Sequence, residues 1–212
     1  AKMGGGDPDS NPRLRTAMLK AKAASMPKDN IERAIKKGTG ELGAVSYEEL
    51  VYEGYAPGGV AVLVDVLTDN KNRAAADVRN IFNKNGGNLG TTGSTSRMFE
   101  RKGVIEYDAE KVSEDDVMSV AVEAGAEDVV NEDGVITVTT DPASFDAVLE
   151  ALQTKEWETL SAAVSMVPFN YTAVDAETAK KVQKLLDKLE ENDDVQNVYH
   201  TAEFPDDFNP EE

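Results

Sequence analysis

The chain has 212 residues with 40 acidic and 22 basic side chains, so its formal net charge at pH 7 is −18. Most of such an acidic surface repels phosphate. This excludes a protein that wraps around nucleic acid with an evenly basic surface. The chain has no cysteine and one histidine, His200, which excludes disulfide frameworks, cysteine nucleophiles and Cys/His zinc sites. No apolar run approaches the roughly 18 residues of a membrane span, so we expect a cytoplasmic protein without membrane contact.

Two helices are predicted in the first 45 residues. Asn11 and Pro12 match an N-cap followed by a first-turn proline, and small or apolar side chains then recur at helical spacing up to Ala24. A second short helix follows around Ile31, with Gly38 as its expected C-terminal stop. Because two helices of this size bury little by themselves, we expect this segment to need support from upstream sequence or from another domain.

From Tyr47 onward the pattern changes to alternating strands and helices. The predicted elements are a strand over 59–67, a helix over 71–84, two short strands between 97 and 107 that break near Lys102 and Gly103, a helix ending at Gly125, strands over 126–131 and 134–139, a helix over 145–152, strands over 159–167 and 167–174, a helix over 182–189 and a strand over 195–201. Residues 104–166 thus read strand, helix, strand, strand, helix, strand, the order of a ferredoxin-like split βαβ domain.

The elements before and after this stretch are expected to complete a second set in the same order. We therefore predict the α+β class, with an N-terminal helical domain followed by two ferredoxin-like α/β domains, one inserted in the other. The predicted domains are residues 1–46, residues 47–103 plus 168–212, and the inserted residues 104–167. A single continuous mixed sheet is the alternative.

The charge is divided unevenly over these segments. Residues 1–45 hold nine basic and five acidic side chains, residues 46–103 hold seven of each, and residues 104–212 hold six and 28. The net charges are therefore +4, 0 and −22. A basic front and an acidic rear are typical of a protein that contacts a polyanion through one end, whereas an acidic surface that only maintains solubility is the alternative.

Several motifs imitate a chemical site without its context. Residues 38–43 match G-x-G-x-x-G but follow a helix instead of a strand, so we interpret them as a flexible linker. The stretch from Asp7 resembles the start of a calcium loop, yet Pro12 stands where glycine is required and Met18 where the ligating glutamate should be. Residues 85–90 end a helix, which favours a glycine C-cap and a strand lead-in over a phosphate-binding loop.

Nothing in the sequence makes a positive case for an enzyme. No pair of carboxylates has a spacing that suits a general acid and a general base. His200 lies inside the last predicted strand, where a structural or surface role is expected. We therefore predict a non-enzymatic protein with no metal, no cofactor and no obligatory small-molecule ligand.

Basic side chains carry a stronger signal. Arg33, Lys36 and Lys37 share one face of the second helix, although cations in a last turn also complement the helix dipole. Cations flank the apolar stripe of the first helix, an arrangement that also fits snorkelling side chains. On the helix over 71–84, arginine and asparagine gather opposite the buried face, and this mixture suits hydrogen bonds to phosphates, sugars or base edges. These faces predict contact with nucleic acid.

Six ordered sequence blocks extend over essentially the whole chain. They are GGGDP with NPRLR (4–15), KAKAASMPKDNIERAIKKGTG (20–40), YEGYAPGG (52–59), DNKNRAAADVRNIFNKNGGNLG (69–90), EAGAEDV (123–129) and DDVQNVYH (193–200). Together they closely resemble the YebC/PmpR family, whose mitochondrial relative is the translational activator of cytochrome oxidase.

The resemblance implies three domains and a cytoplasmic, non-enzymatic function. Bacterial members of the family are commonly described as DNA-binding transcriptional regulators, while the mitochondrial branch and some bacterial members are ribosome-associated translation factors. We therefore predict a nucleic-acid-binding regulator of gene expression that acts on DNA in transcription. The alternative is a ribosome-associated translation factor that binds ribosomal RNA. A third hypothesis is a small-molecule sensor or enzyme built on the ferredoxin-like domains.

The resemblance also implies that the basic helical domain and the adjoining face form the nucleic-acid surface. The residues carried over are Arg13, Arg15, Lys20, Lys22, Lys28, Arg33, Lys36, Lys37, Lys71, Asn72, Arg73, Arg79 and Arg97. Family members usually begin with a further basic stretch containing a Gly-His-Ser-Lys-Trp motif, whereas this chain starts at Ala1. We expect a missing N-terminal segment whose absence weakens both the helical domain and its binding.

Overall fold

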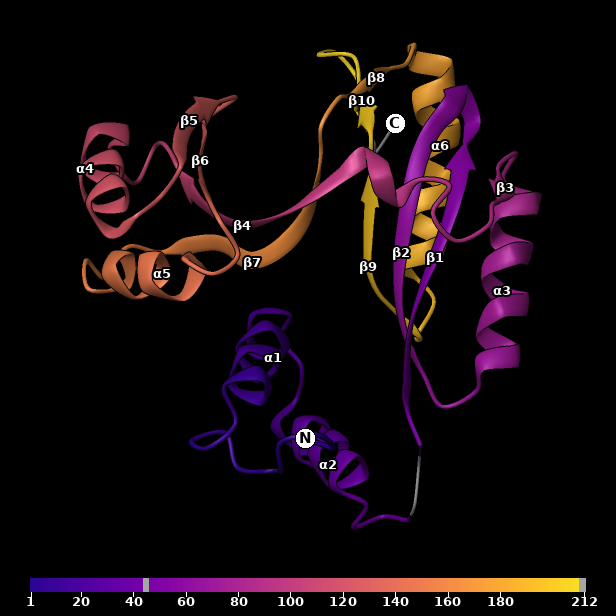
Figure 1. Cartoon of the computed structure of the whole chain (residues 1–212), viewed down its shortest axis with the longest axis horizontal. Coiled ribbons are helices and arrows are strands. Elements are labelled where there is room, and N and C mark those ends of the chain that lie inside the picture. The colour runs from indigo at the N-terminus through magenta and orange to yellow at the C-terminus, as the bar shows by residue number, and fades with distance from the viewer. Residues whose placement is uncertain (44–45, 210–212) are drawn as a thin grey trace. The chain divides into compact units, whose positions relative to one another are not determined.

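The computed structural model describes residues 1–43 and 46–209. The chain forms two compact units, which are Ala1–Glu49 with Leu67–Lys71, and Leu50–Val66 with the residues from Asn72 onward. The parts of the predicted domains that fall on residues 44–45 and 210–212 lie outside the described residues. Figure 1 labels the elements in chain order.

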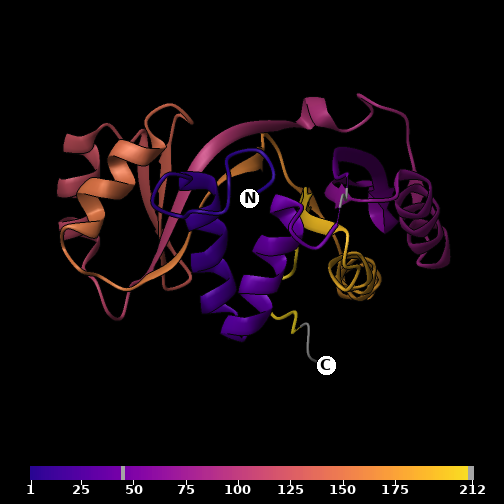
Figure 2. The same ribbon diagram turned by 90° about the horizontal axis from the view of Figure 1, so that it is seen from below.

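The first unit contains two helices, α1 (Pro12–Ala23) and α2 (Lys28–Thr39), which Figure 2 shows in indigo and violet. Asn11 caps α1 as predicted. Its side-chain oxygen accepts the N–H of Leu14 at 3.1 Å, and its amide nitrogen donates to the carbonyl of Gly5 at 2.9 Å. The apolar residues that these two helices bury are Leu14 and Ile31, so each helix buries as little as the sequence indicates.

The end of α2 differs from the prediction. The helix continues through Gly38 and Thr39, and Gly40, with a φ of 86°, supplies the left-handed C-cap. A Cβ at Gly38 would lie 2.9 Å from the Ala1 methyl, so this glycine permits a close approach of the N-terminal segment and does not stop the helix. The G-x-G-x-x-G pattern therefore begins inside a helix and lacks the strand-to-helix turn of a dinucleotide site.

One four-stranded sheet is built from residues 99–168. Its elements are β4 (Phe99–Asp108), α4 (Glu114–Ala124), β5 (Asp128–Glu132), β6 (Val135–Thr140), α5 (Phe145–Gln153) and β7 (Thr159–Pro168). The strand order is β5-β6-β4-β7 and every neighbouring pair is antiparallel, which is the predicted ferredoxin-like arrangement. Val117 of α4 and Leu152 of α5 pack with Ile105 and Ile136 in its core.

The predicted break near Lys102 and Gly103 is wrong, because β4 is one continuous strand. Gly103 pairs with Thr140 on one side and Val164 on the other. A Cβ there would lie 2.2 Å from the Thr140 hydroxyl oxygen and 2.7 Å from the Phe145 ring. The glycine thus allows the start of α5 to approach the sheet closely, and it interrupts no ladder.

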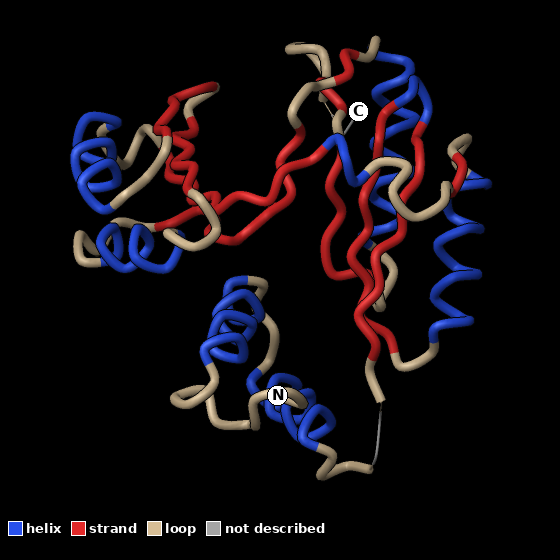
Figure 3. The backbone as a smooth tube through the Cα atoms, in the orientation of Figure 1, coloured by secondary structure: helices blue, strands red, loops and turns tan. Residues whose placement is uncertain are grey.

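A second four-stranded sheet and the helices that belong to it come from the residues before and after residues 99–168. Figure 3 draws the strands in red and the helices in blue. These elements are β1 (Glu48–Ala56), β2 (Val60–Thr68), α3 (Lys71–Lys84), β3 (Asn88–Leu89), α6 (Ala176–Glu190) and β9 (Val195–His200), with the strand order β3-β1-β2-β9. The described strands form separate sheets, not one continuous mixed sheet. The α+β class is confirmed, with helices first and one α/β set interrupting the other.

The element order of the second set differs in detail from the expected one. The unpredicted strand β1 leads directly into β2, and only then does α3 follow. The expected strand over 167–174 is reduced to β8 (Thr172–Ala173), which pairs in parallel with β10 (Ala202–Glu203) in a small separate sheet. The valines of β2 pack with α3 and α6 in one core. None of the described helices has both the length and the apolar character of a membrane span.

Candidate nucleic-acid interface

The side chains predicted to contact nucleic acid are all on the surface. The thirteen residues lie on α1, α2, α3 and the loop before β4, and each is exposed. Exposure makes them accessible, but their present partners differ. Some of these cations bind other residues of the fold, whereas the charge of others faces solvent.

Two cations of α1 bind within their own unit. Arg15 donates to the carbonyls of Pro8 and Asp9 at 3.1 and 3.0 Å, which fastens the N-terminal loop onto the helix. Arg13 forms an exposed ion pair with Glu49. Exposed ion pairs contribute about 0–1 kcal/mol, so Arg13 can exchange its carboxylate for a phosphate at little cost, whereas Arg15 has a structural role.

Three further predicted contacts also have partners. Lys28 lies 3.7 Å from Glu32 one turn later, and the Lys37 ammonium lies 5.7 Å from the centroid of the Tyr47 ring. The guanidinium of Arg73 donates to both carboxylate oxygens of Asp194, at 3.0 and 3.1 Å. Asp194 follows α6, so this ion pair, in which one guanidinium nitrogen contacts both carboxylate oxygens, ties the start of α3 to the loop between α6 and β9.

The four remaining cations of α1 and α2 are Lys20, Lys22, Arg33 and Lys36. Within residues 1–43 and 46–209 none of them forms an ion pair, and all are exposed. Lys20, Lys22 and Lys36 lie in last turns, where they also complement the helix dipole. Because no carboxylate neutralises them, these four charges attract a polyanion more strongly than any other group of cations in the first unit.

Helix α3 presents a face of mixed chemistry. Ala74, Val78 and Phe82 are buried, which confirms the predicted core side of this helix. Arg79 and the amides of Asn72, Asn80 and Asn83 are exposed on the remaining surface. At the end of α3, Gly86 adopts a φ of 77° and Gly87 donates its N–H to the Phe82 carbonyl at 2.9 Å. The glycine-rich segment is therefore a C-cap, as predicted, and leads into β3.

The residue that sequence reasoning missed is Glu53 of β1. Its side chain is 4% exposed. One carboxylate oxygen accepts the N–H groups of Thr95 and Ser96 at 3.0 and 2.6 Å, and the other accepts the N–H of Gly93. The Thr95 hydroxyl lies 3.3 Å from the carboxylate and 3.2 Å from the carbonyl of Val62. Glu53 thus fixes the polar loop that carries Arg97.

The same contacts explain the protonation state of Glu53. Burial alone would raise the pKa of this carboxyl group, but the N–H groups of Gly93, Ser96 and Thr95 stabilise the charged form and together hold the pKa below its usual value. The carboxylate therefore stays charged at neutral pH and is hydrogen-bonded by backbone donors. The sequence does not single out Glu53, because the same strand also contains Glu48 and Glu49, which are exposed.

His200 has a structural environment. Its Nδ1 accepts the N–H of Ala202 at 3.1 Å, and its ring lies 5.8 Å from the ring of Phe204. Burial lowers the pKa of His200 because the protonated ring loses hydration. The neutral imidazole therefore supports the turn between β9 and β10, in agreement with the structural role expected from the sequence.

This environment predicts a pH dependence of stability. Since the folded pKa lies below the unfolded value near 6.5, the unfolded state binds more protons between these two values. The contribution of His200 is complete above about pH 6.5 and is lost as the pH falls toward the folded pKa. We expect the difference in free energy of unfolding between wild type and His200→Gln to shrink from pH 7.5 to pH 5.5, by at most about 1.4 kcal/mol for each pH unit below 6.5. Urea unfolding at both values measures it, and a constant difference would contradict the assignment.

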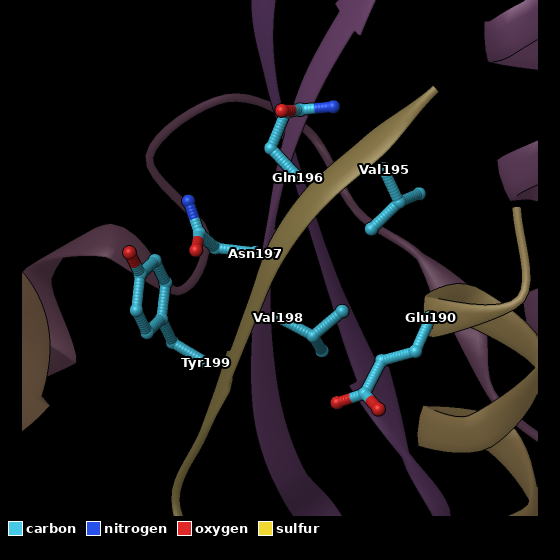
Figure 4. Close-up of a pocket in the computed structure, with 6 residues that line it drawn as sticks. All are labelled: Glu190, Val195, Gln196, Asn197, Val198 and Tyr199. Carbon is cyan, nitrogen blue, oxygen red and sulfur yellow. The ribbon is translucent and has the colours of Figure 1, made fainter. Parts of the chain in front are cut away.

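One hollow of the described surface lies beside the last strand of the second sheet. It measures about 380 Å³ and follows the open edge of β9, where its lining residues are Glu190, Val195, Gln196, Asn197, Val198 and Tyr199 (Figure 4). Burial and the neighbouring Asp65 carboxylate raise the pKa of Tyr199 to about 12, so its hydroxyl stays protonated at neutral pH. In the described residues no group of acidic or histidine side chains could hold a metal ion.

The described fold thus combines a helical unit, in which Lys20, Lys22, Arg33 and Lys36 are exposed, with two four-stranded sheets. The family model described as "TACO1/YebC protein N-terminal domain" matches residues 1–41, and the model described as "TACO1/YebC second and third domain" matches residues 47–202. The chain belongs to the TACO1/YebC family.

Curated relatives are similar over nearly the full chain. A protein of Treponema denticola is 73% identical over 98% of this chain and 84% of its own length, and one of Clostridium novyi is 58% identical over 98% and 85%. Both are named "Probable transcriptional regulatory protein". The crystal structure of a conserved hypothetical protein of Aquifex aeolicus has a TM-score of 0.85, with 49% identity over 97% of this chain and 85% of that chain.

Proposed function

We propose that this protein is a non-enzymatic, cytoplasmic regulator of transcription that binds DNA through the helical unit. The observation that carries the proposal is the group of four exposed cations without ion pairs on α1 and α2, in a chain of net charge −18. The names of the curated relatives support a role in transcription. Contacts would be made mainly to phosphates, which position the protein without reading sequence.

The mixed face of α3 and the exposed Arg97 add to the proposed contacts. Asparagine and arginine offer donors and acceptors to base edges, so α3 is the element from which sequence preference would arise. The full proposed contact set remains the thirteen residues carried over from the family, with Arg15 and Arg73 acting through the loops that they fasten. We also propose the domain division 1–46, 47–103 plus 168–212, and 104–167.

The salt dependence of DNA binding tests this function. Four phosphate contacts predict a slope near −3.6 in a plot of log affinity against log salt, from about −0.9 for each contact. Fluorescence anisotropy with a labelled promoter duplex between 50 and 300 mM salt measures the slope. Absent binding, or binding without salt dependence, would exclude the proposal.

Ribosomal RNA is the second candidate target. The matching family models are named after both TACO1 and YebC, and the resemblance described above connects the mitochondrial branch of the family with translation. Phosphate contacts alone do not distinguish RNA from DNA. Sedimentation of a cell extract on a sucrose gradient after DNase treatment separates the two candidates. Cosedimentation with ribosomes would favour the translational role, and recovery of all the protein at the top of the gradient would favour the transcriptional one.

A further inference from the structure

Two aromatic rings are exposed at the bend between β7 and β8. Phe169 is 60% exposed and Tyr171 is 59% exposed. Neither ring contacts another aromatic ring in the described part of the chain. Rings of this size are usually buried or half-buried, since each carries a large apolar area whose exposure to water is unfavourable. Their exposure in one short bend indicates a surface that binds a partner.

The bend is attached to the loop that Glu53 positions. Phe169 donates its backbone N–H to the carbonyl of Met98 at 3.0 Å, and Pro168 pairs with Phe99 in the ladder between β7 and β4. Met98 follows Arg97 directly, in the short turn Ser96–Met98. The exposed rings and the exposed guanidinium therefore lie on segments that are hydrogen-bonded to each other and fixed by a buried carboxylate.

The two segments contain no acidic side chain. Residues 161–174 contain no charged side chain, although residues 104–212 carry a net charge of −22. Residues 85–99 contain one charged side chain, that of Arg97. The exposed hydroxyls of Thr91 and Thr92 belong to the same loop. This patch combines aromatic rings, a guanidinium and hydroxyls, which match the base, the phosphate and the sugar of a nucleotide.

We propose that Phe169, Tyr171 and Arg97 form a binding site for unpaired nucleotides. The rings stack on the faces of one or two bases while Arg97 binds a phosphate of the same strand. This inference rests on the proposed nucleic-acid function and specifies the form of nucleic acid taken at this place. A duplex does not fit the site in this way, because the faces of its bases are already stacked on their neighbours.

The double variant Phe169→Ala/Tyr171→Ala tests the site in the full chain. Stacking on an aromatic side chain contributes enough that each lost ring lowers affinity by at least about fivefold. We expect the double variant to bind a labelled single-stranded RNA of about 12 nucleotides about 30-fold more weakly than the wild type, and to bind a duplex of the same length with less than about a twofold change. Phe169→Trp/Tyr171→Trp should retain the single-strand affinity because it retains stacking rings.

A matched control removes apolar surface elsewhere. Leu160→Ala/Val122→Ala truncates two side chains that are 52% and 55% exposed, and it should leave single-strand binding unchanged. A strand containing 2-aminopurine gives an independent signal, since stacking on a ring changes its fluorescence and phosphate contact alone does not.

Three results would contradict the stacking site or the proposed function. Equal single-strand binding by the wild type and the Phe169/Tyr171 double alanine variant would exclude the stacking site and leave the proposed function standing. Equal losses for single strand and duplex would also exclude it. Absence of salt-dependent binding by the wild type to either form would exclude the proposed function, and the stacking site with it.

Discussion

Replacement of Lys20, Lys22, Arg33 and Lys36 by glutamine is expected to weaken nucleic-acid binding by about 10²–10³-fold at 0.1 M salt. Within the described residues these four cations of α1 and α2 form no ion pair and donate no side-chain hydrogen bond, so each is available to displace a counterion from phosphate. The slope of log affinity against log salt should become shallower by about 3.6. Anisotropy titrations across a salt series measure both quantities.

A control with the same change in net charge is available on α6. Its four exposed lysines are Lys180, Lys181, Lys184 and Lys188. Glutamine at all four positions also removes four positive charges, but from the acidic part of the chain. We expect it to change the affinity by less than about threefold, because screening at 0.1 M salt limits the effect of charges that do not contact phosphate. If both quadruple variants lose affinity equally, net charge and not the α1–α2 surface governs binding.

Replacement of Glu53 by glutamine is expected to lower the free energy of unfolding by about 2–4 kcal/mol. The carboxylate accepts from three backbone N–H groups and lies against the Thr95 hydroxyl. Glutamine has one acceptor oxygen, and its NH₂ group would face backbone donors that then lack a partner. Urea unfolding at pH 7 measures the loss. Glu48→Gln, on the exposed part of the same strand, should change stability by less than about 0.5 kcal/mol.

The contribution of Glu53 also depends on pH in a defined direction. Because the folded pKa is below the unfolded value near 4.5, the stabilisation is complete above that value and is lost as the pH falls through the folded pKa. The difference between wild type and Glu53→Gln should therefore be constant from pH 7 to pH 6 and narrow below pH 4.5. A difference that persists unchanged at pH 3 would show that the carboxylate charge is not what the loop requires.

The sequence predicts the regular elements best where local chemistry determines them. The Asn11 cap, the valine-rich β2 and the buried face of α3 depend on spacing within a few residues, and all three are confirmed. The roles of Gly38 and Gly103 are harder to predict. The sequence alone does not distinguish a glycine that ends an element from one that allows another segment to approach closely. In both cases the deciding neighbour, Ala1 or Thr140, is distant in sequence.

The sequence predicts which residues of the candidate surface are exposed, but it does not predict which of their charges are available to phosphate. Whether a cation is available to phosphate depends on partners that only the fold brings near. Arg73 pairs with Asp194, 121 positions away, and Arg15 binds the carbonyls of a loop. Glu53 escapes prediction for the same reason. Its backbone donors lie 40 to 43 positions further along the chain.

The acidic run at residues 114–116 has a local structural role. It forms the first turn of α4, after the N-cap Ser113, where carboxylates complement the positive end of the helix dipole. This part of the acidic rear thus contributes to helix stability. Replacement of these three carboxylates by amides would therefore remove their favourable interaction with the helix dipole.

Strand β4 contributes to two separate hydrophobic clusters. Its first residue, Phe99, packs with Ala61 and Leu63, whereas Ile105 and Tyr107 belong to the core with α4 and α5. The ladder with β7 accompanies β4 over this whole length. The interrupting α/β set is therefore attached by a paired ribbon instead of two independent linkers. Because its two strands are paired from Phe99 to Tyr107, the two connections of this set cannot move independently of each other.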